Sequence, residues 1–260
     1  MFFIKLSFLF AIGSICGWVI EVFYRRFFST GHWVNPGYLS GPYLPLYGFS
    51  LVILYLLAGL ESYIPIEQAW LRKALLFLLM ALAITALEFV AGMIFIHGMK
   101  VQLWDYSNHW GNIKGVICPK YSFFWIILSA LYYFLIHPHI LSALEWLSNN
   151  LAFSFGIGFF YGIFVIDLVY STQLMARIRQ FAKESQIVVR IEELRESIRT
   201  SKDRTQEKKR YQFFFPFRSI NLKESLEKYR DTYNESKKNL QEFIQEKKEE
   251  KNKDKEESNT

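Results

Sequence analysis

Three carboxylates lie inside long apolar runs of the sequence: Glu21 in GWVIEVFYRR, Glu88 in ITALEFVAG and Asp167 in FVIDLVYS. An ionisable side chain in hydrocarbon is costly, so each of them must pair, hold a proton or serve a function. Arg25 follows Glu21 by one helical turn, and the two can pair on one helix face. Glu88 has no basic residue within two turns, so we expect its partner to be another helix, a proton or water. Asp167 lies near the end of its run, where an interfacial position would account for it.

Two loops are a second concentration of polar side chains. They read STGHWVNPGYLSGPYLP (residues 29–45) and LWDYSNHWGNIKGVICPKYS (residues 103–122). Both are rich in Gly, Asn, Ser and aromatic residues and poor in long charged side chains, unlike a solvated linker. Irregular backbone at membrane depth is tolerated only where protein buries it or where it lines a cavity. We therefore expect both loops to fold inward, toward the intramembrane charges.

The elements that must position these residues follow from the distribution of charge. Residues 1–175 hold 8 of the 30 Lys and Arg and 7 of the 24 Asp and Glu, and the last 85 residues hold the others. Five stretches reach or approach the roughly 20 apolar residues that a membrane-spanning helix needs. They are residues 3–24, 43–60, 74–97, 121–137 and 151–175, of which the second and fourth are short. The sequence predicts an all-α, polytopic membrane bundle of about five transmembrane helices over residues 1–175.

A charged tail follows the predicted bundle. Pro216, in RYQFFFPFRS, forbids one continuous helix and separates two apolar seams. We predict that residues 176–250 form a cytoplasmic antiparallel coiled-coil hairpin, or alternatively that each helix pairs with another chain. Residues 251–260 are expected to be disordered. The first seam consists of Ile187, Ile191, Leu194 and Ile198, and the second helix starts at Asn221 with Glu224 in a capping box and continues through Leu222, Leu226, Tyr229, Tyr233, Leu240 and Phe243.

Charge and motifs also set the orientation and exclude several functions. The basic residues of the tail predict a cytoplasmic C-terminus and an N-terminus outside. The sequence contains no G-x-x-x-x-G-K-[ST], no H-E-x-x-H and no G-x-S-x-G, and we predict no cofactor and no metal, the HPH at 137–139 being a weak signal. Basic tail residues are interleaved with acidic ones, which argues against a nucleic-acid partner. Their excess next to the bundle suits the anionic headgroups of a lipid bilayer.

The motifs GWVIEVFYRR, VNPGYLSGPYLPLYG, LEFVAG, LWDYS, GVIC and YSFFW follow one another over about residues 10–125. In this region the chain resembles the bacterial family of type IV ABC-transporter permeases, also called CmpB-like. The resemblance implies a multi-pass protein of the bacterial inner membrane that works as a transport permease. Two positions depart from the family pattern: Pro36 replaces a common arginine, and Pro119 replaces a usual leucine.

The resemblance also gives the positions of a candidate polar cluster and of a turn. The prolines of the turn can occupy the first turn of a helix, and its glycines allow close backbone approach. The cluster consists of Glu21, Arg25, Asn35, Tyr43, Tyr47, Glu88, Trp104, Asp105, Tyr106, Ser107, Asn112, Tyr121 and Ser122, and the turn contains Gly37, Gly41, Pro42, Pro45 and Gly48.

Three functions are open at this point. The first is a transport component whose polar cluster lines a cytoplasm-facing cavity and which needs a separate ATPase subunit, because the chain has no phosphate-binding loop. The second is an intramembrane enzyme that acts on a lipid or its headgroup, since clustered carboxylates and arginine serve such chemistry. The third is a structural or sensory membrane protein that works through self-association or partner binding of its tail, with the intramembrane polar residues as glue between helices.

Overall fold

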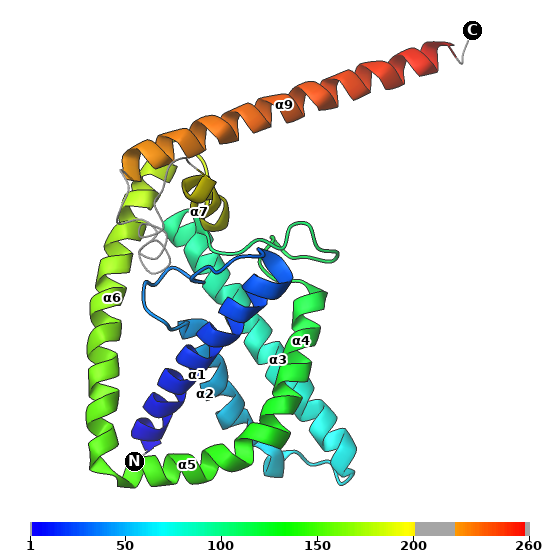
Figure 1. Cartoon of the computed structure of the whole chain (residues 1–260). Coiled ribbons are helices and arrows are strands. Elements are labelled where there is room, and N and C mark those ends of the chain that lie inside the picture. The colour runs from blue at the N-terminus through cyan, green and yellow to red at the C-terminus, as the bar shows by residue number, and fades with distance from the viewer. Residues whose placement is uncertain (1, 201–221, 258–260) are drawn as a thin grey trace.

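The computed structural model describes residues 2–200 and 222–257, and in these residues helices dominate (Figure 1). Two short strands, β1 (Val101–Gln102) and β2 (Val189–Arg190), are the exception. The helices of the apolar part are α1 (Phe2–Tyr24), α2 (Pro45–Ala58), α3 (Ala69–Met93), α4 (Pro119–Leu131), α5 (His137–Asn149) and α6 (Leu151–Glu184). The helices of the tail are α7 (Ile191–Thr200) and α9 (Leu222–Glu257). Four short segments are π- or 3₁₀-helical: η1 (Arg25–Ser29), η2 (Glu61–Tyr63), η3 (Ile94–Met99) and η4 (Tyr132–Ile136).

Four continuous helical segments are long and apolar enough to cross a membrane. They are Phe2–Ser29, Ala69–Met99, Pro119–Leu147 and Ala152–Glu184. The prediction of an all-α membrane bundle is therefore confirmed. The second predicted span, residues 43–60, is a helix of only 14 residues, α2. At about 1.5 Å per residue, α2 is too short to cross the hydrocarbon core of a bilayer by itself. The rest of the crossing would have to be irregular backbone that the surrounding protein buries.

Small residues allow α1 and α2 to cross in close contact. Gly13 and Gly17, four residues apart on α1, face the start of α2. A Cβ added to Gly13 would lie 2.8 Å from Cβ of Leu51, and one added to Gly17 would collide with the side chain of Tyr47. On the other helix, α2, a Cβ added to Gly48 would lie 2.7 Å from the carbonyl oxygen of Phe10 on α1. Small residues at such spacing are typical of close helix pairs in membranes.

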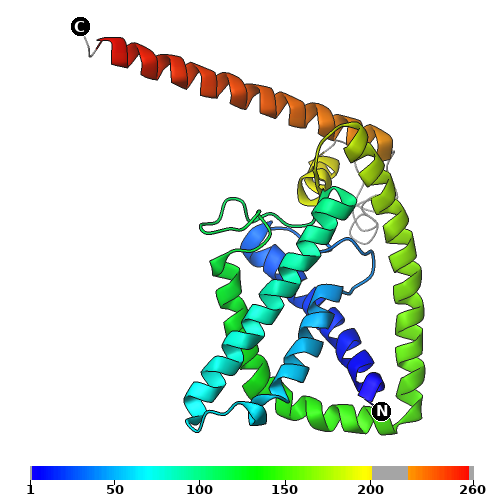
Figure 2. The same ribbon diagram turned by 180° about the vertical axis from the view of Figure 1, so that it is seen from behind.

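The bundle has two different ends. At one end α5 turns across the helices, close to the N-terminus, and joins α4 to α6 (Figure 1). The other end, here called the tail end, contains the loop before α2, the loop between β1 and α4, and α7. Figure 2 shows from behind that α6 runs along the side of the bundle from α5 to the tail end.

The first part of the tail packs onto the bundle instead of standing free. Strands β1 and β2 pair in parallel, with Val101 opposite Val189. Around them a buried core combines the last turns of α6, α7 and the first turns of α9. Its fully or nearly buried side chains are Val101, Met175, Ile178, Ala182, Ile187, Val189, Ile191, Leu194, Leu226 and Tyr229.

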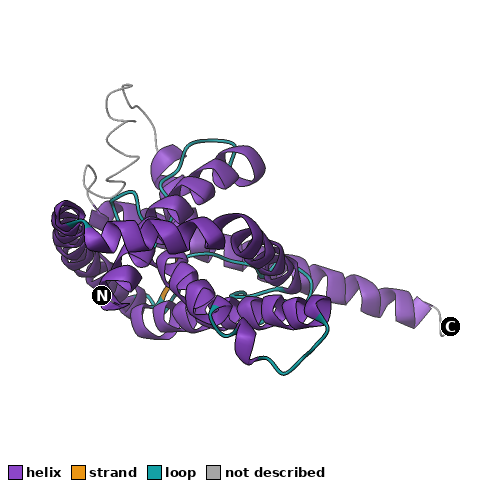
Figure 3. Ribbon diagram, turned by 90° about the horizontal axis from the view of Figure 1, so that it is seen from below, coloured by secondary structure: helices purple, strands orange, loops and turns teal. Residues whose placement is uncertain are grey.

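The second tail helix begins where predicted, at Leu222 after Asn221, but the first apolar seam is not one helix: Ile187 lies in the connection before β2, and α7 begins only at Ile191. Tyr229 on α9 donates a hydrogen bond to Glu193 on α7, at 3.1 Å, so the start of α9 contacts α7. The rest of α9 projects beyond the bundle, as Figure 3 shows from below. A coiled coil along α9 and the boundaries at residues 175 and 250 remain predictions. The segment RYQFFFPFRS lies outside the described residues, and α9 extends to Glu257, into the segment expected to be disordered.

Candidate functional site

A cavity of about 730 Å³ lies at the tail end, between α1, α2, α3 and α4 and beneath α7. The two polar loops approach it, as expected from their composition. Eight of the thirteen predicted cluster residues line it: Glu21, Arg25, Tyr47, Glu88, Trp104, Asp105, Tyr106 and Tyr121. The other five, Asn35, Tyr43, Ser107, Asn112 and Ser122, do not line it, and of the turn residues Gly37 and Pro45 do.

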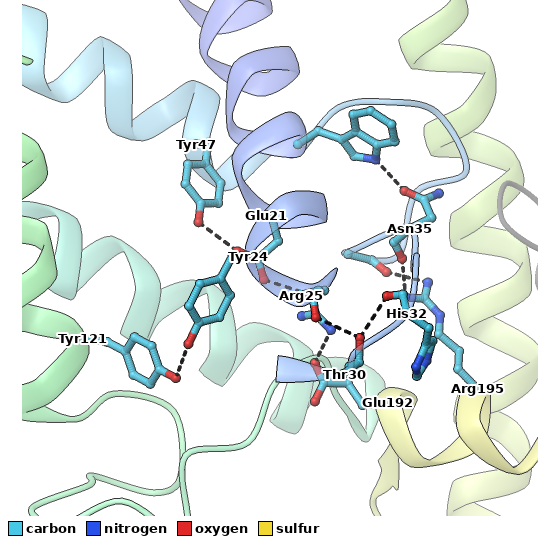
Figure 4. Close-up of polar contacts among 12 residues, drawn as sticks. Glu21, Tyr24, Arg25, Thr30, His32, Asn35, Tyr47, Tyr121, Glu192 and Arg195 are labelled. Carbon is cyan, nitrogen blue, oxygen red and sulfur yellow. Dashed lines mark hydrogen bonds and ion pairs between the residues drawn. The ribbon is translucent and has the colours of Figure 1, made fainter. Parts of the chain in front are cut away.

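Arg25 joins the bundle to the tail through two carboxylates (Figure 4). Its Nε lies 3.0 Å from Glu21 Oε1, which is the pair predicted from the spacing on α1. Its Nη1 lies 2.6 Å from Glu192 Oε1 on α7, 167 residues further along the chain. Tyr47 on α2 donates to the second oxygen of Glu21 at 3.0 Å. The guanidinium is thus shared between one intramembrane carboxylate and one from the tail.

Glu88 is buried, with 4% of its surface exposed. Trp125 Nε1 on α4 donates to one of its oxygens at 3.1 Å, and the Tyr106 hydroxyl donates to the other at 3.1 Å. Burial and the neighbouring Glu88 carboxylate raise the pKa of Tyr106, so Tyr106 stays a neutral donor. The expected partner from another helix is therefore present. Both bonds come from uncharged donors, and among the described residues no cation forms an ion pair with Glu88.

Aromatic side chains join the two carboxylates. The rings of Tyr106 and Tyr121 stack with their centres 4.4 Å apart. The hydroxyl of Tyr121 lies 3.0 Å from that of Tyr24 on α1, where either can donate (Figure 4). Tyr47 lies beside Trp125, with ring centres 5.8 Å apart. Two sets of rings therefore cross to α4, one from Tyr24 on α1 and one from Tyr47 on α2.

The turn before α2 is held by Asp167 on α6. This carboxylate accepts bonds from the backbone N–H of Ser40 and Gly41, at 3.0 and 2.9 Å, and from the Tyr43 hydroxyl at 2.7 Å. Ser171, one turn later on α6, donates to its other oxygen at 3.1 Å. Asp167 was absent from the predicted cluster, although it shares with Glu21 and Glu88 the signal of a charge within an apolar run. Tyr43 is thus a support of the turn.

Asn35 anchors the other side of the same turn. Its side-chain oxygen accepts from Trp18 Nε1 on α1 at 2.6 Å (Figure 4). Its side-chain nitrogen donates to the backbone carbonyls of Leu39 and Ser40, at 3.3 and 3.0 Å. Gly37 has φ of +75°, a conformation that favours glycine. These bonds fix the shape of the turn without placing Asn35 in the cavity.

The second loop is also fixed by its own side chains. Asn112 donates to the carbonyls of Ser107 and His109 and accepts from the N–H of Gly115, all within 3.1 Å. Asp105 accepts from the N–H of Ser107 at 2.9 Å. Trp104 Nε1 donates to the carbonyl of Val116 at 2.9 Å, and Ser122 accepts from Thr85 on α3 at 3.2 Å. Ser107, Asn112 and Ser122 therefore support the site from outside the cavity.

The segment of β2 and α7 docks on both loops through arginines that the sequence analysis placed in the charged tail. Arg195 donates to the carbonyls of Asn35 and Gly37, at 2.7 and 2.6 Å, on either side of Pro36. Burial lowers the pKa of Arg195 to about 10, and the neighbouring Arg25 contributes, but the side chain stays protonated at neutral pH. Arg190 pairs with Asp105 at 3.2 Å. No pattern in the tail distinguishes these contacts from ordinary solvent-exposed charges.

Arg195→Ala is expected to loosen α7 by about 2 kcal/mol, because two charge-assisted hydrogen bonds to partly buried carbonyls are lost. Hydrogen exchange of the amides of residues 189–195 should then be roughly 30-fold faster than in the wild type. Arg230→Ala is the matched control, because Arg230 pairs on the surface of α9 with its neighbour Asp231. Equal protection of α7 in both variants would show that Arg195 does not hold the helix down.

A family model described as "Putative ABC-transporter type IV" matches residues 8–172. The match covers the apolar part of the chain and extends beyond the region of about residues 10–125 in which the resemblance was seen. It ends within α6, before α7 and α9. No curated protein and no solved structure matches the chain.

Proposed function

Because the chain belongs to the family described as putative ABC-transporter type IV, we propose that it is the membrane-embedded component of a transporter. Its solute would bind in the cavity at the tail end. The observation that carries this proposal is the cavity itself, which holds Glu21 and Glu88 at membrane depth and is covered by α7. Charged groups around a cavity within the bilayer are a general mark of substrate and ion pathways.

The polar contacts of α7 support a role in coupling. Glu192 and Arg195 connect the tail to Arg25 and to the turn before α2, so a movement of α7 would change the cavity directly. Energy for such a movement would come from a separate ATPase subunit, because the sequence has no phosphate-binding loop. We place the tail end and α9 in the cytoplasm, at the bacterial inner membrane, because the tail carries most of the basic residues. The exposed part of α9 would then be available to that subunit or to a second copy of the chain.

The proposal is tested by isolating the protein from its native membranes. Cells are treated with a crosslinker and the protein is purified in a mild detergent. We expect a subunit with a Walker A sequence to co-purify and the complex to hydrolyse ATP in a vanadate-sensitive way. Truncation after residue 233 should reduce the recovered ATPase several-fold, because it removes the projecting part of α9 and keeps Leu226 and Tyr229 in the core.

Glu67→Gln serves as a control, because Glu67 lies exposed in the connection between η2 and α3 at the opposite end of the bundle. It should recover the ATPase as the wild type does. A wild-type preparation that is stable, crosslinked and free of any ATP-hydrolysing subunit would contradict the proposal.

A further inference from the structure

The cavity at the tail end carries an excess of acidic groups. Among the described residues that line it are four carboxylates, Glu21, Glu88, Asp105 and Glu192, and one guanidinium, that of Arg25. Arg25 is already shared between Glu21 and Glu192, and Asp105 pairs with Arg190. His109 is the remaining lining residue that can be charged near neutral pH. Arg195 also lies beside Arg25 and Glu192, so the guanidinium groups offset the other three carboxylates and Glu88 carries the remaining negative charge of the lining. A positively charged ligand would therefore be favoured beside Glu88 and an anion disfavoured there.

Glu88 is the carboxylate best placed to meet such a charge. It is buried on α3, and both of its bonds come from neutral donors, Tyr106 and Trp125. A buried carboxylate held by neutral donors gains from a cation that it can pair with. The rings around it add to this preference, because Trp104, Tyr106 and Trp125 line the same cavity. Aromatic faces attract organic cations, most strongly where water is excluded.

Another part of the cavity wall is apolar and exposed. Val90 and Ile94 on the α3 side and Phe124 and Ile127 on α4 line the cavity, and each of these side chains is exposed. Since these helices are long and apolar enough to span a membrane, the exposed side chains face lipid in the membrane. A ligand could thus place an apolar part among lipid chains and its charged part beside Glu88. The volume of about 730 Å³ suits a small organic molecule.

We propose that this cavity binds an amphipathic organic cation, an ammonium-type group attached to an apolar body. Its positive group would lie between Glu88 and the rings of Tyr106 and Trp125, and its apolar body would lie against Val90 and Phe124. As a statement about the transported solute the inference rests on the proposed function. As a statement about binding it stands alone, because binding needs no ATPase subunit.

The test uses two ions of the same shape and opposite charge, tetraphenylphosphonium and tetraphenylborate. Their binding to the purified protein is measured by equilibrium dialysis in detergent micelles, with protein-free micelles as the reference for partition and Glu67→Gln as the control for the loss of one carboxylate away from the cavity. We expect saturable binding of the phosphonium and at least about tenfold weaker binding of the borate. Comparable affinity for both ions, or no saturable binding of the phosphonium, would overturn the inference.

Two variants connect the binding to the cavity. Glu88→Gln keeps an oxygen for Trp125 or Tyr106 but removes the charge, so phosphonium affinity should fall about tenfold or more. Ala91→Trp fills the cavity from α3 without a change of charge and should abolish saturable binding. If Glu88→Gln fails to fold, the Ala91→Trp variant decides the question. Wild-type affinity in the folded variants would show that the ion binds elsewhere.

Lipid competition identifies the source of the cation. Phosphatidylethanolamine or phosphatidylglycerol is added to the micelles at equal concentration. Competition by phosphatidylethanolamine alone would identify a lipid amine as the ligand, and competition by neither lipid would identify a free amphipathic cation. Equal competition by both lipids would contradict the preference for positive charge. Failure of phosphonium binding leaves the ATPase complex as a separate test of the transport proposal.

Discussion

Gly17→Val is expected to destabilise the protein by about 3 kcal/mol or more, because it separates α1 from α2. The added Cβ would collide with Cβ and Cγ of Tyr47, atoms too near the α2 backbone to rotate away. Any displacement of Tyr47 also weakens its hydrogen bond to Glu21, so the same substitution disturbs the cavity. The measurement is thermal unfolding of the purified protein in detergent micelles, followed by intrinsic fluorescence.

The control for this substitution is Gly162→Val. Gly162 is also a helical glycine, on α6, but nothing lies within 4 Å of a Cβ built there. The two variants share the change in helix propensity and in apolar surface, so their difference reports the helix contact. We expect Gly162→Val to unfold within about 0.5 kcal/mol of the wild type. Equal destabilisation of both variants would mean that the close crossing of α1 and α2 does not limit stability.

Asp167→Ala is expected to cost about 2–4 kcal/mol, because it removes one acceptor from several donors at once. The N–H groups of Ser40 and Gly41 and the hydroxyl of Tyr43 all point at this carboxylate. Burial and the bond to Asp167 also raise the pKa of Tyr43, so it stays a neutral donor that needs an acceptor. Unfolding in micelles measures the loss, and hydrogen exchange at Ser40 and Gly41 should accelerate specifically.

Ser171→Ala is the matched variant on the same helix. It deletes a single donor to Asp167 and leaves the turn before α2 in place. Its cost should be about 1 kcal/mol, with normal exchange at Ser40 and Gly41. Asp167→Asn should fall between the two, because an amide keeps one oxygen for the backbone N–H groups. Unchanged exchange in Asp167→Ala would remove Asp167 as the support of the turn.

The parts of the fold that follow from local physics could be predicted from the sequence. Apolar runs gave the long helices, and the four-residue spacing gave the pair of Glu21 and Arg25, because both depend on neighbours along one helix. The inward folding of the loops at residues 29–45 and 103–122 could be predicted because both contain few charged side chains. The shortness of α2 did not follow, since its apolar run includes residues such as Gly59 and Leu60, which lie beyond the helix.

Contacts between distant segments could not be predicted. Asp167 and Ser40 are separated by 127 residues, and Arg195 and Asn35 by 160, so no local spacing relates them. The apolar seam that contains Ile191 and Leu194 fits a coiled coil as well as it fits the core beside β1. Periodicity identifies a buried face, but it does not identify the surface that buries it.

The docking of α7 has a consequence for the order in which the protein is made. The turn at Asn35–Gly37 and strand β1 leave the ribosome early, whereas their partners, Arg195 and Val189, are synthesised after the last long apolar helix. Until then their backbone groups must be satisfied by water or by insertion factors. The cavity is therefore completed only after α7 has been synthesised. A product truncated before residue 189 would insert its helices yet remain open at the tail end, where quality-control proteases could recognise it.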